Sequence, residues 1–128
     1  MSGVSKIMDS EFEIMKVLWA AKEALTANEI FERLTKAWSK STAVTLINRL
    51  VEKGAVGSVK RGVYFYSPIV TEEEYLRYHA DHFLQKMFNG NPKNLLAFFC
   101  SHEGITAEDL DEIRRGIEAG GERDERNM

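Results

Sequence analysis

The sequence predicts a mainly α-helical chain with one small β-hairpin. Helix starts are marked five times, and after each start the apolar residues recur with a helical period. A strand pattern occurs once, in AVGSVKRGVYFYS, where β-branched and aromatic residues flank a turn that contains glycine. The predicted order is three helices, the hairpin, three further helices and a polar tail.

Four of the helix starts pair a hydroxyl with a carboxylate three residues later. This spacing lets both groups bond to N–H groups that the first helical turn leaves free. The fifth start is an asparagine cap followed by proline at the first helical position. The five starts are Ser10–Glu13, Thr26–Glu29, Thr71–Glu74, Asn91-Pro92 and Thr106–Asp109.

The third predicted helix, in KSTAVTLINRLVEKG, has an unusual polar face. Its polar residues fall within one arc of about 120°, and most carry short hydroxyl or amide groups instead of the usual Lys and Glu. The apolar residues lie opposite, with Val44 at the border. The arc holds Ser41, Thr42, Thr45, Asn48, Arg49 and Glu52, and the apolar side holds Ala43, Leu46, Ile47, Leu50 and Val51.

Short polar side chains on a helix suit the major groove of DNA, because they allow the helix to approach the base edges closely. Threonine offers a methyl group to thymine, and asparagine can pair with adenine through two hydrogen bonds. The predicted base-reading residues are Ser41, Thr42, Thr45 and Asn48.

Charge is unevenly distributed along the chain, whose net charge is −3. Residues 1–70 hold ten basic and seven acidic side chains, whereas residues 71–128 hold seven and thirteen. The order of three helices, the third of them polar, and a basic hairpin is that of a winged helix-turn-helix. The residues predicted to contact the DNA backbone are Lys36, Lys40, Arg49, Lys53, Lys60 and Arg61.

The chain is predicted to divide near residue 70. Residues 1–70 form a winged-helix DNA-binding domain, residues 71–118 a three-helix dimerisation domain, and residues 119–128 a disordered polar tail. Three amphipathic helices are thin for an independent core, so their apolar residues need a partner, and a second copy of the chain is the simplest one. The predicted dimer interface comprises Leu76, Phe83, Met87, Leu95, Phe98, Phe99, Leu110, Ile113 and Ile117.

Six segments spread over residues 7–118 form a long and specific pattern: FEIMKVLW, LTANEIFERL, WSKSTAVTLINRLVEKG, YFYSP, FLQKMFNGNPKNLLAFF and ITAEDLDEIRRGIE. Together they resemble the penicillinase-repressor family, which includes the BlaI, MecI and CopY repressors. The resemblance implies an N-terminal winged-helix domain, a C-terminal dimerisation domain from Glu72 onward, and a homodimeric repressor of a palindromic operator. It also implies that Thr42, Thr45 and Arg49 occupy recognition-helix positions.

The chain departs from the family pattern at three places. Ser41 and Val44 stand where family members often have basic residues, so their operator preference does not transfer directly. Antibiotic-responsive members are cleaved at an Asn-Phe bond, where this chain has Phe98-Phe99, so the sequence leaves release by a protease open. The paired Cys-x-Cys motifs of the copper-responsive branch are missing from the C-terminal end, GGERDERNM, so that kind of metal sensing is not expected.

Other functions have weaker support in the sequence. His79 and His82 lie one helical turn apart, and Cys100 and His102 follow later, but these residues show no full set of metal ligands and we predict neither a metal nor a cofactor. No catalytic motif occurs, so no enzyme activity is expected. Two alternatives remain open: a protein-interaction adaptor built on a winged helix, and a metal- or redox-responsive regulator of the same fold.

The sequence also predicts a cytoplasmic protein without a membrane partner. The first residues contain no apolar run of the kind found in a secretory signal, and the longest apolar run, LLAFFC, is far too short to cross a membrane. The single cysteine, Cys100, fits a reducing compartment. The sequence does not identify an upstream protease or sensor.

Overall fold

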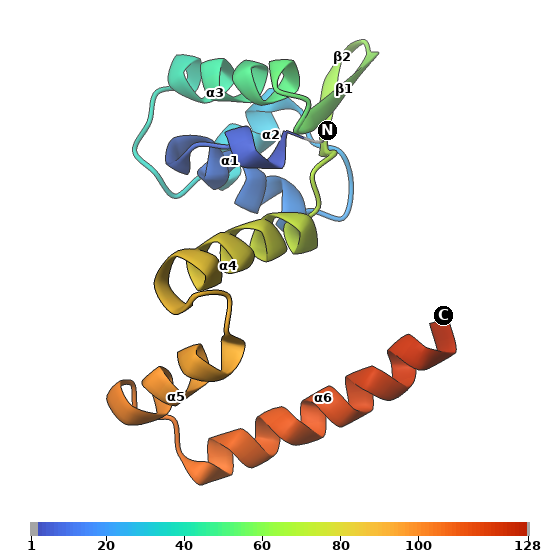
Figure 1. Ribbon diagram of the computed structural model, residues 1–128. Coiled ribbons are helices and arrows are strands. Elements are labelled where there is room, and N and C mark those ends of the chain that lie inside the picture. Colours follow the sequence, from blue (N-terminus) through green and yellow to red (C-terminus); the bar gives the residue numbers. More distant parts are fainter. Residues whose placement is uncertain (1–2, 128) are drawn as a thin grey trace. The chain divides into compact units, whose positions relative to one another are not determined.

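The computed structural model describes the backbone of residues 3–127 and the side chains of residues 3–120. Residues 1–2 of the predicted first domain and residue 128 of the predicted tail lie outside the described residues. The predicted order of helices and hairpin is confirmed (Figure 1). The elements are a 3₁₀ turn η1 (Val4–Lys6), α1 (Asp9–Ala20), α2 (Ala27–Arg33), α3 (Lys40–Glu52), β1 (Val56–Arg61), β2 (Val63–Pro68), α4 (Glu72–Phe88), α5 (Pro92–His102) and α6 (Ala107–Asn127).

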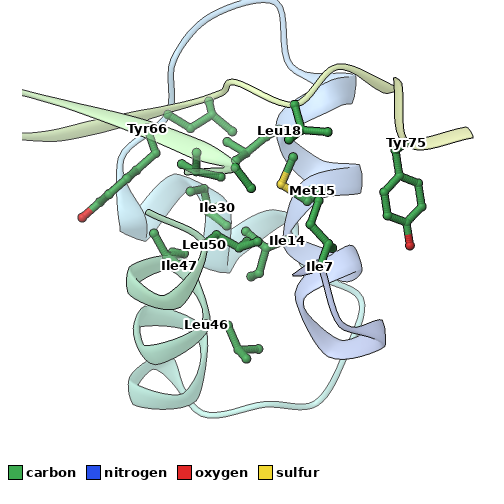
Figure 2. Close-up of a cluster of buried hydrophobic side chains, with 14 residues drawn as sticks. Ile7, Ile14, Met15, Leu18, Ile30, Leu46, Ile47, Leu50, Tyr66 and Tyr75 are labelled. Carbon is green, nitrogen blue, oxygen red and sulfur yellow. The ribbon is translucent and has the colours of Figure 1, made fainter. Parts of the chain in front are cut away.

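A hydrophobic core lies among α1, α2, α3 and the hairpin (Figure 2). Each helix contributes the apolar residues that its helical period places on one side, and each fully buried aliphatic side chain contributes about 1.5–3 kcal/mol. Figure 2 shows Tyr75, from α4, at the margin of this cluster. The helical core residues are Ile14, Met15, Leu18, Ile30, Leu46, Ile47 and Leu50.

The β-hairpin pairs β1 with β2 in antiparallel register, with Arg61 opposite Val63 across Gly62. Gly62 has a φ of 78°, a backbone conformation that glycine adopts without steric cost. Leu25, in the loop between α1 and α2, extends the sheet. Its N–H donates to the Tyr66 carbonyl at 2.9 Å, and its carbonyl accepts from the Tyr66 N–H at 2.7 Å. The base of the hairpin is therefore fixed to the helices, while its tip projects beyond them (Figure 1).

Four of the five predicted helix starts are confirmed, and the start at Ser10 is wrong. Helix α1 begins at Asp9, and its first turn is closed by the Glu11 carboxylate, which accepts from the Met8 N–H at 2.9 Å. Ser10 lies inside that turn, because Glu11 has the required spacing from Met8. The confirmed starts are Thr26–Glu29, Thr71–Glu74, Asn91-Pro92 and Thr106–Asp109.

The chain forms two compact units, and the first extends to Ala80 instead of ending at the predicted residue 70. We call it the winged-helix unit. The difference arises because Tyr75, on the first turns of α4, is buried against Phe12 and Trp19. Because these two rings belong to α1, the first turns of α4 pack on the winged-helix unit and belong to it.

The second unit begins at Asp81, and we call it the C-terminal unit. None of residues 81–120 is buried, although aromatic rings of α4 and α5 meet, with Phe88 centred 5.9 Å from Phe98. Helix α6 continues to Asn127, where the sequence predicted a disordered tail from residue 119. The tail has no proline, and its Glu and Arg residues favour a helix, whereas Gly120 and Gly121 disfavour one. Across the described residues, no helix is both long and apolar enough to cross a membrane.

Candidate nucleic-acid interface

Helix α3 has the two faces that its sequence predicts. Ala43, Leu46, Ile47 and Leu50 are buried against the core. The opposite side carries the predicted base-reading residues, all four of which are exposed. The structure therefore places three hydroxyl groups and one amide group on the same exposed face of α3. These exposed residues are Ser41, Thr42, Thr45 and Asn48.

The start of α3 is organised by Ser39, a residue that the sequence analysis did not identify. The Ser39 hydroxyl caps the helix by accepting from the Thr42 N–H at 3.2 Å. It also lies 2.9 Å from the Thr42 hydroxyl and 3.2 Å from the Ser41 hydroxyl. Three hydroxyls are thus linked at the helix end that enters the major groove in helix-turn-helix proteins.

Thr45 has a defined orientation. Its hydroxyl donates to the Ser41 carbonyl, one turn earlier, at 2.9 Å. Because the only proton of the hydroxyl is used there, the group offers an outside partner its lone pairs, and the methyl group offers an apolar contact. Thr45 is therefore suited to accept from an exocyclic amino group or to pack on a thymine methyl.

The hairpin presents basic side chains next to an aromatic ring. Lys60 and Tyr64 stand directly opposite each other in the strand register, and the Lys60 ammonium lies 5.6 Å from the centre of the Tyr64 ring. This cation–π contact holds a flexible side chain near one position. Arg61 is exposed beside the turn.

A cleft of about 310 Å³ separates the hairpin from the first residues of α2 and α3. Lys40 lies on one side of it and Tyr64 on the other, with Asn28 from α2 nearby. Asn28 and Tyr64 were missed by the sequence analysis. The position of Tyr64 opposite a lysine of the hairpin was a signal in the sequence that pointed to it.

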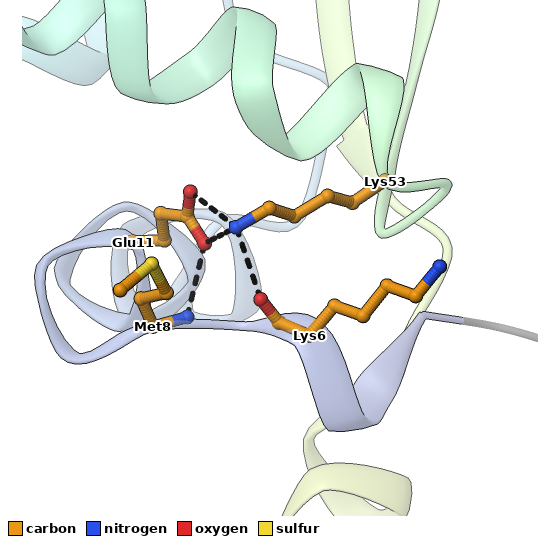
Figure 3. Close-up of polar contacts among 4 residues, drawn as sticks. All are labelled: Lys6, Met8, Glu11 and Lys53. Atoms are coloured by element: carbon orange, nitrogen blue, oxygen red, sulfur yellow. Dashed lines mark hydrogen bonds and ion pairs between the residues drawn. The ribbon is translucent and has the colours of Figure 1, made fainter.

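Lys53 differs from the other residues predicted to contact the DNA backbone, because its ammonium is bonded within the winged-helix unit (Figure 3). Its ammonium lies 2.5 Å and 2.7 Å from the two carboxylate oxygens of Glu11, and it donates to the Lys6 carbonyl at 3.0 Å. Glu11 is fully buried. A buried carboxylate needs a partner, and Lys53 supplies it with 23% of its own side chain exposed.

The other predicted basic residues have exposed side chains. Arg49 lies on the polar face of α3, Lys40 is the first residue of the same helix, and Lys36 lies in the loop before it. The structure therefore places five basic side chains on α3, its preceding loop and the hairpin tip. They are Lys36, Lys40, Arg49, Lys60 and Arg61.

The predicted dimer residues keep large apolar surfaces in contact with solvent. Six are exposed, and the other three are only partly buried. The exposed residues are Leu76, Phe83, Met87, Phe98, Ile113 and Ile117, and the partly buried ones are Leu95, Phe99 and Leu110.

Two of the three histidines considered as metal ligands, His79 and His102, pack on aromatic rings. The His79 ring lies 4.3 Å from Tyr75, and the His102 ring stacks on Phe98 at 4.3 Å. Cys100 is a partly buried free thiol. No group of three His, Cys, Asp or Glu side chains suited to a metal ion is present in the part of the chain that the structure describes.

Comparison with known proteins gives consistent matches. The family model described as "Penicillinase repressor" matches residues 7–119. The penicillinase repressor of Bacillus licheniformis is 31% identical over 121 residues, which cover 92% of this chain and 94% of that protein. The methicillin resistance regulatory protein MecI of Staphylococcus aureus strain N315 is 31% identical over 112 residues, covering 85% and 90%.

A solved structure resembles the winged-helix unit. The solution structure of the DNA-binding domain of the repressor BlaI superposes with a TM-score of 0.52 and 37% sequence identity. The match covers 59% of this chain and 94% of that domain.

Proposed function

We propose, since this chain belongs to the penicillinase repressor family, that it is a DNA-binding transcriptional repressor whose α3 reads an operator in the major groove. The family is made up of transcriptional repressors, and the chain is not an enzyme. The observation that carries the proposal is the exposed face of short hydroxyl and amide groups on α3, beside a basic hairpin.

The base-reading role falls to the residues that α3 exposes. Asn48 has the amide that can bond to both N6 and N7 of adenine. Thr45 offers its methyl group and an acceptor oxygen, because its proton is already bonded to Ser41. Ser41 and Thr42 contact bases near the start of the helix, where the Ser39 hydroxyl holds them in place.

Backbone contacts come from the five exposed basic side chains. Arg49 and Lys40 extend from α3 toward the phosphates on either side of the groove, and Lys36 adds a contact from the preceding loop. Lys60 and Arg61 reach the neighbouring backbone from the hairpin tip, with Lys60 oriented by Tyr64. These contacts supply affinity and fix the register of the helix, and they carry no direct sequence information.

We propose further that the protein binds a palindromic operator as a homodimer. The C-terminal unit has no buried residue between 81 and 120, so its apolar side chains have no core to fill within one copy. A second copy buries the same residues on both sides of a two-fold axis. The two α3 helices then meet two inverted half-sites that are separated by one helical turn of about 10 base pairs, or a small multiple of it.

Selection of bound sequences from a random DNA pool tests the proposal. The purified full chain is incubated with the pool at near-physiological salt, and the bound duplexes are amplified and sequenced. We expect an enriched motif with two-fold symmetry. A single enriched half-site without symmetry would contradict the dimer, and a pool without any enriched motif would contradict sequence-specific repression.

A further inference from the structure

The connection between the hairpin and α4 is fixed to the winged-helix unit at several points. Val70 is fully buried, and its carbonyl accepts from the indole N–H of Trp19 at 2.9 Å. The N–H groups of Ile69 and Val70 both donate to the Ala55 carbonyl, at 2.8 Å and 3.1 Å. The Thr71 hydroxyl then caps α4 immediately. The chain therefore has no flexible linker between its hairpin and α4.

Tyr75 fixes the first turns of α4 to the core. Only 8% of its surface is exposed, and its ring stacks on Phe12 with the centres 4.9 Å apart and the planes 11° from parallel. Trp19 packs beside it at 5.4 Å and His79 at 4.3 Å. Burial, with a smaller contribution from Asp9, raises the pKa of the Tyr75 hydroxyl, which is consistent with the enclosed position of the ring.

Tyr75 and the first of the exposed apolar residues are neighbours on one continuous helix. Helix α4 runs without interruption from Glu72 to Phe88. Leu76 follows Tyr75 directly and is 58% exposed, and Phe83 and Met87 continue the exposed apolar set. The residue that anchors α4 to the winged helix and three of the residues proposed to join two copies therefore belong to one continuous helix.

We propose that Tyr75 is a positioning residue that fixes the direction in which α4 leaves the winged helix, and thereby sets the half-site spacing that the dimer accepts. This inference rests on the proposed homodimeric repressor. Two additional base pairs between half-sites shift one half-site by about 7 Å and rotate it by about 70°. A dimer in which α4 leaves each winged helix in a fixed direction can bind both half-sites at the longer spacing only if the protein or the DNA is deformed. A dimer with a flexible connection before α4 can bind them with little loss of free energy.

The experiment compares full-length variants on synthetic duplexes. Each duplex carries two inverted copies of the half-site recovered from the random pool, with the spacing between them increased in steps of one base pair. Tyr75→Ala removes the stacked ring, Tyr75→Phe keeps it, and Arg77→Ala is the control, because Arg77 is exposed on the same turn and has only a surface ion pair with Glu73. Affinity for a duplex with one half-site is measured for every variant.

We expect the wild-type chain to prefer the optimal spacing over one with two additional base pairs by about thirtyfold. Tyr75→Ala lowers this ratio to about threefold while its affinity for one half-site stays within about twofold of wild type. Tyr75→Phe and Arg77→Ala keep the wild-type ratio. A Tyr75→Ala protein that retains the full spacing preference would overturn the inference, as would a wild-type protein that binds all spacings equally. Loss of binding to the single half-site by the wild-type chain would instead contradict the proposed function.

A second variant and a second measurement cover the case in which Tyr75→Ala fails to fold. Insertion of Gly-Ser-Gly between Val70 and Thr71 keeps the Trp19 contact and detaches α4, so the spacing ratio should fall as it does for Tyr75→Ala. Backbone ¹⁵N relaxation on the full chain gives order parameters for residues 72–80. Values of about 0.85, equal to those of the core, support the fixed junction, and values below about 0.6 overturn it whatever the DNA result.

Discussion

The two units of this protein differ in whether their apolar side chains are buried within one chain. The winged-helix unit buries its aliphatic residues in a core that helices α1 to α3 and the hairpin complete within one chain. The C-terminal unit has helices of similar amphipathic pattern, yet none of its residues up to 120 is buried. The first unit therefore has a core of its own, and the exposed apolar residues of the second unit are those that the proposed homodimer would bury.

Net charge also changes along the chain, close to residue 70 and so before the boundary between the two units. Residues 1–70 have an excess of basic side chains, and residues 71–128 have nearly twice as many acidic as basic ones. DNA attracts the first and repels the second, so the charge distribution favours contact through α3 and the hairpin and disfavours contact through the later helices. Four predictions test this division of roles, from the largest expected effect to the smallest.

Salt should affect the two units very differently. A dimer with five basic contacts per subunit neutralises up to ten phosphates, and affinity for operator DNA should fall by about 10³-fold or more between 50 and 200 mM salt. Association through apolar helices should hardly change, since burial of apolar surface does not depend on released counterions. Fluorescence anisotropy of a labelled duplex gives the first quantity, and analytical ultracentrifugation gives the second. DNA affinity that is insensitive to salt would favour the protein-interaction adaptor.

Phe83→Glu should separate the copies. Phe83 is exposed in one chain, so a carboxylate there is tolerated by the monomer, but in the proposed dimer it is buried without a partner. We expect a monomer with normal helix content whose affinity for a palindromic duplex is about 100-fold lower, because the second half-site no longer benefits from linkage. Gln85→Glu adds the same charge to the same helix outside the apolar set and serves as the control. A Phe83→Glu protein that sediments as a dimer would show that the interface lies elsewhere.

The ion pair between Glu11 and Lys53 should be important for the stability of the winged-helix unit alone. Lys53→Met leaves a fully buried carboxylate without its charged partner, and we expect the free energy of unfolding to fall by about 3 kcal/mol. The double variant Glu11→Leu with Lys53→Met should recover most of the loss, because no unpaired charge remains. Urea denaturation followed by Trp fluorescence measures both. A Lys53→Met protein of unchanged stability that loses DNA affinity would return Lys53 to the backbone-contacting set.

Local sequence patterns predicted most of the fold, and one helix start shows the limit of this approach. A helix start or a hairpin depends on residues within a few positions of one another, so Thr71–Glu74 and the turn at Gly62 are visible in the sequence. The prediction of a helix start at Ser10–Glu13 was wrong because Met8 and Glu11 have the same spacing, and it is Glu11 that bonds to the N–H of the residue before the helix. The local sequence pattern does not distinguish between these two pairs.

Long-range contacts account for what the sequence analysis missed in the site. Lys53 looks like another basic residue of a DNA-binding segment, and its partner Glu11 lies 42 positions earlier. Tyr75 looks like part of a separate helix, but its ring stacks on Phe12, so the first unit extends past the predicted boundary. In contrast, the polar face of α3 needed only the helical period, which is why it was predicted correctly.

Thr45→Ala tests the α3 surface with the smallest expected effect. The change removes a hydroxyl and a methyl from an exposed position, so the fold should be unaffected. Affinity for the selected operator should fall by about 1–3 kcal/mol, whereas affinity for an unrelated duplex should stay nearly constant, because phosphate contacts are unchanged. Thr45→Ser separates the two groups, since it keeps the acceptor oxygen and removes only the methyl.

The matched control for this comparison is Thr35→Ala, which makes the same change at an exposed threonine outside α3. Equal losses on both duplexes for Thr45→Ala would mean that the residue supports binding without reading bases. A loss confined to the operator, and shared by Thr45→Ser, would assign the discrimination to contact between the methyl group and a thymine. The specificity would then come from shape and apolar contact at a position whose hydroxyl is already bonded within the helix.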